Sequence, residues 1–314
     1  MTHKLKVAIV QDSPVPLAIA PGLDKAVAKA REAIEKGARV VAFGEGFLGG
    51  YPAWLEHVAP ARLWDHPGTR ELHALLLDQA LSGEDPRFQP LQWTVDIADV
   101  AVSVGGYERV RQSLYATQFL FRPKAPVLIL PPAEKLMLGQ GDGSTLGLHT
   151  APWGRIGQLA STEHWMPLAR AAMHHEGETV HVAAWPSLTD IAMLASAHYA
   201  YEGRAFVLAA GTVQHKQELI AGYEKAGGDG SARKLLDRLP EGQVQHGHSA
   251  ILAPDGAVIA QAGAAPEMLM AEIDLDEVDR GLATMDVDGA QARHDVFELS
   301  VDRRARAGIV EKAA

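Results

Sequence analysis

Two short segments of the chain place side chains that could move protons or attack carbon directly after apolar runs. Glu45 lies between two glycines just past the run 38–43, and Ser161 follows the run 154–160 at a sharp turn. A small side chain on a strand-to-helix elbow is where nucleophiles lie in α/β enzymes. A carboxylate at the carboxyl end of a strand points into the crevice where such proteins bind ligands, although Glu45 alone would also fit a solvated loop. The pattern predicts a site at Ser161 and leaves Glu45 open between a site residue and a solvated loop.

The chain contains no cysteine. This excludes disulfides, thiolate metal sites and a thiol nucleophile. The net charge of −10, from 29 basic and 39 acidic residues, and the lack of basic runs interleaved with aromatics argue against nucleic acid and membrane partners. Only four consecutive apolar residues precede Gln11, too few for a signal peptide or a membrane span, so we expect a cytoplasmic protein.

Apolar periodicity predicts a mixed α/β chain with strand, helix and strand over 6–11, 23–37 and 38–43. A second set of buried strands and helices surrounds the turn at Ser161. The expected strands are 100–105, 113–121, 154–160, 181–184, 206–211 and 268–273, with a helix over 195–203 and a hairpin over 249–262. Residues 107–109 are expected between two strands, 216–242 as a charged surface loop, and the residues after 273 as tail-like. With no repeat or linker visible, we expect one domain over 1–300 and a tail over 301–314.

The proline-bracketed apolar segment 127–130 cannot be a central strand, because proline donates no hydrogen bond to a sheet, so we expect a sheet edge or a loop. The glycine run 139–144 is superficially similar to a phosphate loop. It lacks the Lys-Ser/Thr ending, which argues against nucleotide binding.

Taken together, these motifs resemble the nitrilase branch of the carbon–nitrogen hydrolase superfamily. The resemblance covers nearly the whole chain, in the stretches 7–12, 40–52, 139–146, 154–173, 181–187, 202–211, 249–260 and 290–302. It implies an α-β-β-α sandwich, assembled face to face with a second subunit and often into larger spirals, that acts on a small molecule. We expect no cofactor.

Members of that family use a cysteine nucleophile, a glutamate base, a lysine that stabilises the tetrahedral intermediate, and a second glutamate. The resemblance maps the base onto Glu45 and the second glutamate onto Glu134. The cysteine position falls on Ser161, in a pattern where Thr162 replaces the usual tryptophan. The lysine position falls on Val127. Lys124 and Lys135 are near in sequence, but neither occupies the motif position.

The loss of thiol and ammonium changes the expected chemistry. A thiol with a pKa of about 8.5 yields useful thiolate beside a carboxylate, whereas a serine hydroxyl is far less acidic. Losing a charge aimed at the developing anion can cost about 10²–10³ in rate. An engineered Cys→Ser exchange would explain Ser161 but not the rewritten segment 122–133, so we favour natural divergence.

Three interpretations stay open. In the first, Glu45 and Glu134, with Glu163 or His164, act as acid and base on a small nitrogen compound of nitrile, amide or amidine type without a covalent intermediate. In the second, the protein is an inactive relative that binds a ligand or regulates an active partner. In the third, weak hydrolysis proceeds through Ser161.

Aromatic side chains and histidines beside these motifs are candidates for substrate contact, with core packing as the alternative. The set is Tyr51, Trp54, His164, Trp165 and Trp185, and Trp185 is the one we favour for setting substrate shape. His174 and His175 point in different directions on a helix, whereas His246 and His248 could share a strand face. Without thiolates or carboxylates at ligand spacing, we expect no metal site.

Overall fold

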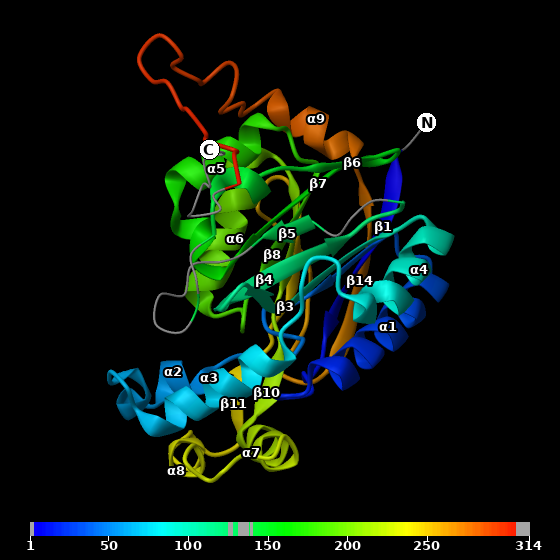
Figure 1. Cartoon of the computed structure of the whole chain (residues 1–314). Coiled ribbons are helices and arrows are strands. Elements are labelled where there is room, and N and C mark those ends of the chain that lie inside the picture. Colours follow the sequence, from blue (N-terminus) through cyan, green and yellow to red (C-terminus); the bar gives the residue numbers. More distant parts are fainter. Residues whose placement is uncertain (1–2, 125–127, 131–137, 139–140, 306–314) are drawn as a thin grey trace, which may run out of the picture.

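The computed structural model describes residues 3–124, 128–130, 138 and 141–305. In this part of the chain, two six-stranded sheets lie face to face, with helices on both outer faces (Figure 1). The first sheet has the order β14-β1-β2-β3-β4-β5, and the second has the order β13-β12-β9-β8-β7-β6. The expected α-β-β-α sandwich is confirmed.

The first sheet contains β1 (Lys4–Gln11), β2 (Val40–Phe43), β3 (Ala101–Val110), β4 (Ser113–Phe121), β5 (Leu128–Leu130) and β14 (Glu267–Asp274). The second contains β6 (His149–Ala151), β7 (Gly154–Ala160), β8 (Val180–Ala184), β9 (Phe206–Ala210), β12 (Ala250–Leu252) and β13 (Val258–Gln261). Strands β1, β2 and β3 are parallel, as are β7, β8 and β9. The carboxyl ends of each parallel set therefore meet at one edge of its sheet.

The outer face of the first sheet is covered by α1 (Ile19–Glu35) and α4 (Gln89–Ala98), and that of the second by α5 (Pro167–His175) and α6 (Asp190–Gly203). Beyond one end of the sheets lie α2 (Ala53–His57), α7 (Lys216–Lys225), α8 (Arg233–Leu236) and the pair β10 (Val213–His215) and β11 (Gln243–His246), as Figure 1 shows. Helix α3 (Pro67–Gln79) lies next to α2 near one end of the first sheet and contacts β3 and β4. Helix α9 (Asp276–Leu282) and the short 3₁₀ turns η1 (Ala59–Arg62), η2 (Pro86–Phe88), η3 (Gly143–Thr145) and η4 (Ser161–Trp165) complete the elements.

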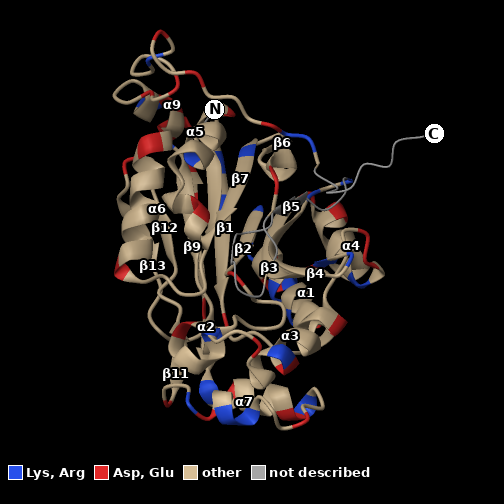
Figure 2. Ribbon diagram, turned by 60° about the vertical axis from the view of Figure 1, so that its left-hand side comes forward, with Lys and Arg blue, Asp and Glu red and all other residues tan. Residues whose placement is uncertain are grey.

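Strand β1 shows how the alternation of the sequence builds the layers. Val7 and Ile9 pack between the two sheets, whereas Ala8 and Val10 pack on the side of α1. Successive strand residues point to opposite faces, so a continuous apolar run fills two cores at once. Charged residues lie mainly on the helices and loops (Figure 2).

Hydrogen bonds among three buried polar residues join the two sheets. Ser103 of β3 donates to Gln158 of β7 at 2.7 Å, and Gln118 of β4 donates to Ser103 at 2.8 Å. Gln158 in turn donates to the carbonyl of Gln118 at 2.8 Å, and all three residues are fully buried. Because buried amides need partners, these bonds fix how the sheets face each other.

Three expectations about elements were wrong. Residues 107–109 continue β3, because Tyr107 to Arg109 pair with Leu114 to Ala116 of β4. The segment 216–242 contains α7 and α8, whose Leu219 and Leu236 are buried, and residues 276–282 form α9. The expected sheet edge at 127–130 is confirmed for its described part, since β5 is the outermost strand of its sheet. Among the described residues, no helix combines the length and apolar character needed to cross a bilayer.

Candidate functional site

Ser161 is the first residue after β7 and has a φ of +43°, a conformation that residues with a side chain rarely adopt. The chain then turns through η4 into α5, so the strand, elbow and helix order expected from sequence is confirmed. We call residues 161–164 the elbow. Such a left-handed residue persists only where its surroundings hold it in place, and these positions concentrate at functional sites.

Glu45 lies just past the end of β2, and its side chain is buried. Its backbone amide donates to the carbonyl of Trp185 at 3.0 Å, directly after β8 in the other sheet. Because Ala184 pairs with Ala160, Trp185 is also the neighbour of Ser161 across the parallel strands. Glu45 and Ser161 therefore flank the same residue at the carboxyl ends of β2, β7 and β8, where α/β proteins bind ligands.

Glu163 folds back over the elbow. Its carboxylate accepts a hydrogen bond from the amide of Ala160 at 2.9 Å. Burial raises the pKa of Glu163 to about 7, although that hydrogen bond opposes the change. A carboxyl group that is half protonated near neutral pH can both give and take a proton.

His164 is buried, with 1% of its surface exposed, and both of its ring nitrogens have partners. Nδ1 lies 3.0 Å from the carbonyl of Ser161, and Nε2 lies 3.1 Å from Nε2 of His181. Its ring stacks on Trp185, with centroids 4.9 Å apart. This arrangement favours a supporting role for His164 over direct contact with a substrate.

The predicted aromatic contacts lie in different surroundings. Trp54 is 1% exposed within the core on the α1 side, and Trp185 is buried with its indole N–H donating to Ser196 at 3.0 Å. Trp165 is 45% exposed at the end of η4. Tyr51 is half-buried, and its backbone exchanges two hydrogen bonds with Gln214. The structure thus brings Trp185 to Ser161 and Glu45, while Trp54 belongs to the core.

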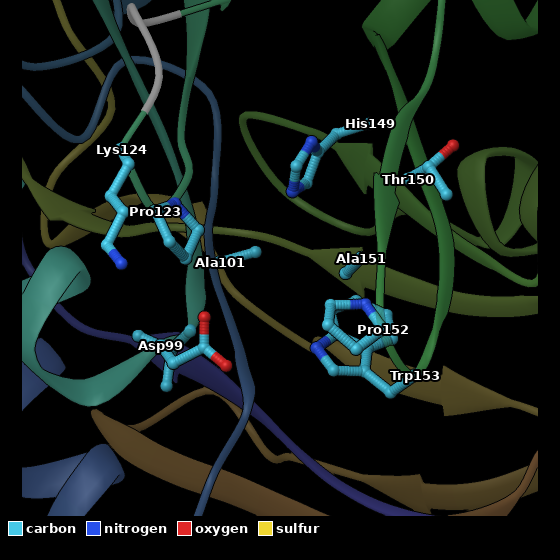
Figure 3. Close-up of a pocket in the computed structure, with 10 residues that line it drawn as sticks. Asp99, Ala101, Pro123, Lys124, His149, Thr150, Ala151, Pro152 and Trp153 are labelled. Atoms are coloured by element: carbon cyan, nitrogen blue, oxygen red, sulfur yellow. The ribbon is translucent and has the colours of Figure 1, made fainter.

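Glu134, Lys135 and Val127 lie outside the described residues, so the roles of the second glutamate and of the lysine position stay predictions. Lys124 is described, and it lines a separate cavity of about 250 Å³ together with Asp99, His149 and Trp153 (Figure 3). That cavity lies where β3 and β7 begin, at the opposite ends of these strands from Ser161.

Comparison with known proteins gives the family. The model of the carbon–nitrogen hydrolase family matches residues 6–281. This chain belongs to the carbon–nitrogen hydrolase family. It is 31% identical to an aliphatic nitrilase of Sinorhizobium fredii, over 99% of both chains. It is 33% identical to an aliphatic nitrilase of Rhodococcus rhodochrous, over 96% of this chain and 80% of that one.

Solved structures of the nitrilase superfamily share the fold at low sequence identity. The chain matches Saccharomyces cerevisiae Nit3 with a TM-score of 0.66 and 14% identity, covering 94% of this chain and 97% of that one. It also matches an amidase from Nesterenkonia sp. AN1 with a TM-score of 0.59 and 16% identity, covering 88% and 95%. That amidase has an active-site cysteine that acrylamide modifies. This carbon–nitrogen hydrolase differs, because its sequence contains no cysteine at all.

Sequence reasoning missed the buried residues that form hydrogen bonds leading to His164 of the elbow. Glu178 and His181 are fully buried next to His164, and Tyr199 of α6 donates to Glu178. The available signal was a carboxylate and an imidazole three residues apart at the start of a buried strand. In the part of the chain that the structure describes, no three His, Asp or Glu side chains gather where they could share a metal ion.

Proposed function

We propose that this carbon–nitrogen hydrolase acts on a small compound of nitrile, amide or amidine type, by acid–base chemistry without a thiol intermediate. The names of its relatives, which include aliphatic nitrilases, support the substrate class. The candidate groups are Glu45 and Glu163, together with Glu134, which the family resemblance assigns. The substrate would bind at the carboxyl ends of β2, β7 and β8.

The observation that carries this proposal is the residue type at position 161, which differs from the one that the family resemblance implies. The elbow holds Ser161 with a φ of +43°, where the family resemblance places a cysteine, and no other residue of the chain can supply a thiol. Glu45 is buried, and its backbone amide donates to the carbonyl of Trp185, whose ring stacks on His164 of the elbow. The framework of the site is therefore kept while the sulfur nucleophile is lost.

Two carboxyl groups, those of Glu45 and Glu163, can serve this chemistry. In the hydration of a nitrile, a water oxygen bonds to the nitrile carbon while one C–N π bond breaks. Glu45 would accept a proton from that water, and protonated Glu163 would give one to the nitrogen. A shift of the remaining proton from oxygen to nitrogen completes the amide, so all atoms balance. The pKa of Glu163, raised to about 7 by burial, suits it to give that proton near neutral pH.

A second candidate function is slow hydrolysis through an ester on Ser161. The left-handed backbone at Ser161 favours it, because strain of this kind presents nucleophiles in α/β enzymes. A carboxylate is a weak base for a hydroxyl, so we expect this route to be the slower one.

The experiment compares wild-type protein with Glu45→Gln and Ser161→Ala on a panel of small nitriles, amides and amidines. We expect Glu45→Gln to lower turnover by about 10²-fold or more and Ser161→Ala to retain it. Glu108→Gln is the matched control, since Glu108 is another buried glutamate of the first sheet, and it should change turnover little.

Intact mass measured after incubation with substrate separates the interpretations. An ester on Ser161, lost in Ser161→Ala together with activity, would replace the proposal with the second candidate. A wild-type protein that binds these compounds without converting them would identify the inactive, regulatory relative.

We also propose that the protein forms a homodimer or a larger spiral through the face formed by α5 and α6. Large apolar side chains are exposed there, at Leu168, Ile191, Leu194 and Tyr201, next to Trp165. An exposed apolar patch of this kind marks a protein interface. We expect the assembly to be cytoplasmic.

A further inference from the structure

A chain of buried polar side chains runs from the second sheet to the carbonyl of Ser161. Glu178 accepts from Nδ1 of His181 at 2.7 Å, Nε2 of His181 lies 3.1 Å from Nε2 of His164, and Nδ1 of His164 lies 3.0 Å from the Ser161 carbonyl. Tyr199 donates to the other oxygen of Glu178. Each of these four side chains is at most 3% exposed.

The hydrogen bonds determine where the protons lie. A carbonyl oxygen only accepts, so Nδ1 of His164 must carry a hydrogen. A neutral His164 then has a lone pair on Nε2, and the facing Nε2 of His181 must donate. His181 also donates from Nδ1 to the carboxylate of Glu178, which makes it a donor at both nitrogens. An imidazole with hydrogens on both nitrogens is a cation.

We propose that His181, held as a cation by Glu178, is a positioning residue that fixes the tautomer of His164 and thereby clamps the carbonyl of Ser161. The clamp holds the left-handed elbow and directs the side chain at position 161 into the crevice. His181 lies between Glu178 and the elbow, so its positive charge is nearer to position 161 than the balancing negative charge is. It touches no reacting atom and acts through His164.

The electrostatics of the pocket agree with this proton arrangement. Burial, followed by the charge of His181, holds the pKa of His164 well below its ordinary value, so His164 stays neutral. Burial alone would raise the pKa of Glu178, but the charge and hydrogen bond of His181 hold it below its ordinary value. Burial and the negative charge of Glu178 keep the pKa of Tyr199 well above its ordinary value, so Tyr199 stays a donor.

Other charged or titratable groups lie near the hydrogen-bonded side chains of Glu178, His181 and His164, on the elements packed against them. Arg170 of α5 donates to the carbonyl of His164 at 3.0 Å and to Glu202 of α6 at 2.7 Å. His174 of α5 lies 3.2 Å from the same carboxylate, and Glu163 lies on the elbow itself. None of these groups has a hydrogen bond to His181 among the described contacts, so the cation depends on Glu178.

The backbone leaves room for this arrangement. A Cβ on Gly157 of β7 would lie 2.2 Å from a carboxylate oxygen of Glu178, so only glycine lets that carboxylate reach His181. The rings are also fixed by stacking, His181 on Tyr199 with centroids 3.9 Å apart and His164 on Trp185. The distances and the packing therefore both support a rigid arrangement of Glu178, His181 and His164, which we call the relay.

The proposal rests on the proposed function only in taking Ser161 as a site residue, and its test needs no turnover. In the wild-type protein with ¹⁵N-labelled histidine, NMR should find hydrogens on both nitrogens of His181 and only on Nδ1 of His164. Glu178→Gln should remove one of the His181 hydrogens. A neutral His181 in the wild-type protein would overturn the proposal.

A second readout uses the absence of natural cysteines. Ser161→Cys creates a single thiol, whose alkylation by iodoacetamide across a range of pH reports the thiolate population at the elbow. Adding His181→Phe should raise the pH midpoint and slow alkylation near neutral pH by about fivefold, because a cation beside a thiol favours the thiolate. Adding His174→Gln removes a buried imidazole that packs on Tyr199 but has no described hydrogen bond to His181 or His164, and it should change the rate less than about twofold.

An unchanged alkylation profile after His181→Phe would contradict the proposed clamp, even if every variant lacked enzyme activity. Equal slowing by His181→Phe and His174→Gln would also contradict it, because the effect would then be general loosening. Failure of the proposed function appears elsewhere, as a wild-type protein that converts no nitrile, amide or amidine while its histidine signals stay as expected.

Discussion

The backbone amide of Glu45 donates a hydrogen bond to the carbonyl of Trp185 across 3.0 Å, which ties the end of β2 in one sheet to the end of β8 in the other. Trp185 also neighbours Ser161, because Ala184 and Ala160 are paired. The distance between the buried carboxyl and the elbow is thus set by how the two sheets face each other. Small displacements between the sheets should reach the site directly.

Gly105→Ala tests this dependence. A Cβ at Gly105 of β3 would lie 2.6 Å from the carbonyl of Gly44 and 2.7 Å from Cα of Glu45. Backbone atoms cannot move aside cheaply, so we expect a loss of about 1–3 kcal/mol in the free energy of unfolding and a displaced Glu45. Denaturant titration and turnover measure the two effects. Gly263→Ala, where a Cβ meets no atom within 4 Å, is the control; equal behaviour of both variants would contradict the prediction.

Glu108→Gln tests the pH dependence of stability. Burial raises the pKa of Glu108 to about 7 in the folded protein. The folded state therefore keeps a proton that the unfolded state loses above about pH 4.5, and stability falls as pH rises until about pH 7. Glutamine mimics the protonated form, so the variant should gain about 1–3 kcal/mol over wild type near pH 8 and little near pH 4.

The measurement for Glu108→Gln is the free energy of unfolding as a function of pH. Parallel curves for wild type and variant would show that Glu108 ionises normally in the folded protein. The same variant serves as the buried control for Glu45→Gln, because it removes a carboxyl group from the same sheet.

The sequence predicted the elements that carry the site because their signals are local. Apolar runs ending at Phe43 and Ala160 define β2 and β7, and the glycines and small residues after them define the turns. The sandwich followed from the resemblance to a family, whereas the strand order came only from the structure. The approach of Glu45 to Ser161 followed only from placing both at carboxyl ends of strands, since they are far apart in the chain.

The support behind the elbow could not be predicted in the same way. Glu178, His181 and Tyr199 belong to a loop end, a strand and a helix, and their contacts depend on how α6 packs on the second sheet. Burial of α7 and α8 likewise depends on distant partners, such as Glu71 of α3, which accepts from Tyr223 of α7. The many charged residues in the segment 216–242 gave no indication that α7 and α8 would be buried.

Trp185 can be tested by two substitutions of different size. The side chain is buried, its indole donates to Ser196, and its ring stacks on His164. Trp185→Ala should cost about 3–5 kcal/mol of stability, as for other large buried aromatics. Trp185→Phe keeps most of the packing and should change the preference among substrates while shifting the melting temperature little. A large loss of stability in Trp185→Phe with unchanged substrate preference would make the residue purely structural.

Leu194→Glu tests the proposed interface on α6. Leu194 is 59% exposed beside Ile191, so a charge there should leave the fold intact but oppose burial against a second copy. Light scattering coupled to gel filtration should show a smaller assembly than for wild type. Ile97→Glu on α4, at an 88% exposed residue of the other outer layer, is the control and should leave the assembly unchanged.

Ser161→Cys tests whether the lost sulfur alone separates this protein from a thiol-dependent nitrilase. The variant has one cysteine, held at the elbow beside Glu45, and we expect it to form a covalent adduct with acrylamide that mass spectrometry detects. We expect its nitrile turnover to stay within about tenfold of wild type, because the family resemblance puts the position of the stabilising lysine on Val127.

A much larger gain in nitrile turnover by Ser161→Cys would mean that a cation from elsewhere in the chain reaches the crevice. Lys124 and Lys135 are the near candidates by sequence, and Lys124 lines the cavity at the opposite strand ends. Adding Lys135→Met to Ser161→Cys then locates the cation, since loss of the gained turnover would assign it to Lys135. With neither gain nor adduct, the elbow would not present its side chain to solvent, and the left-handed backbone at residue 161 would serve the fold alone.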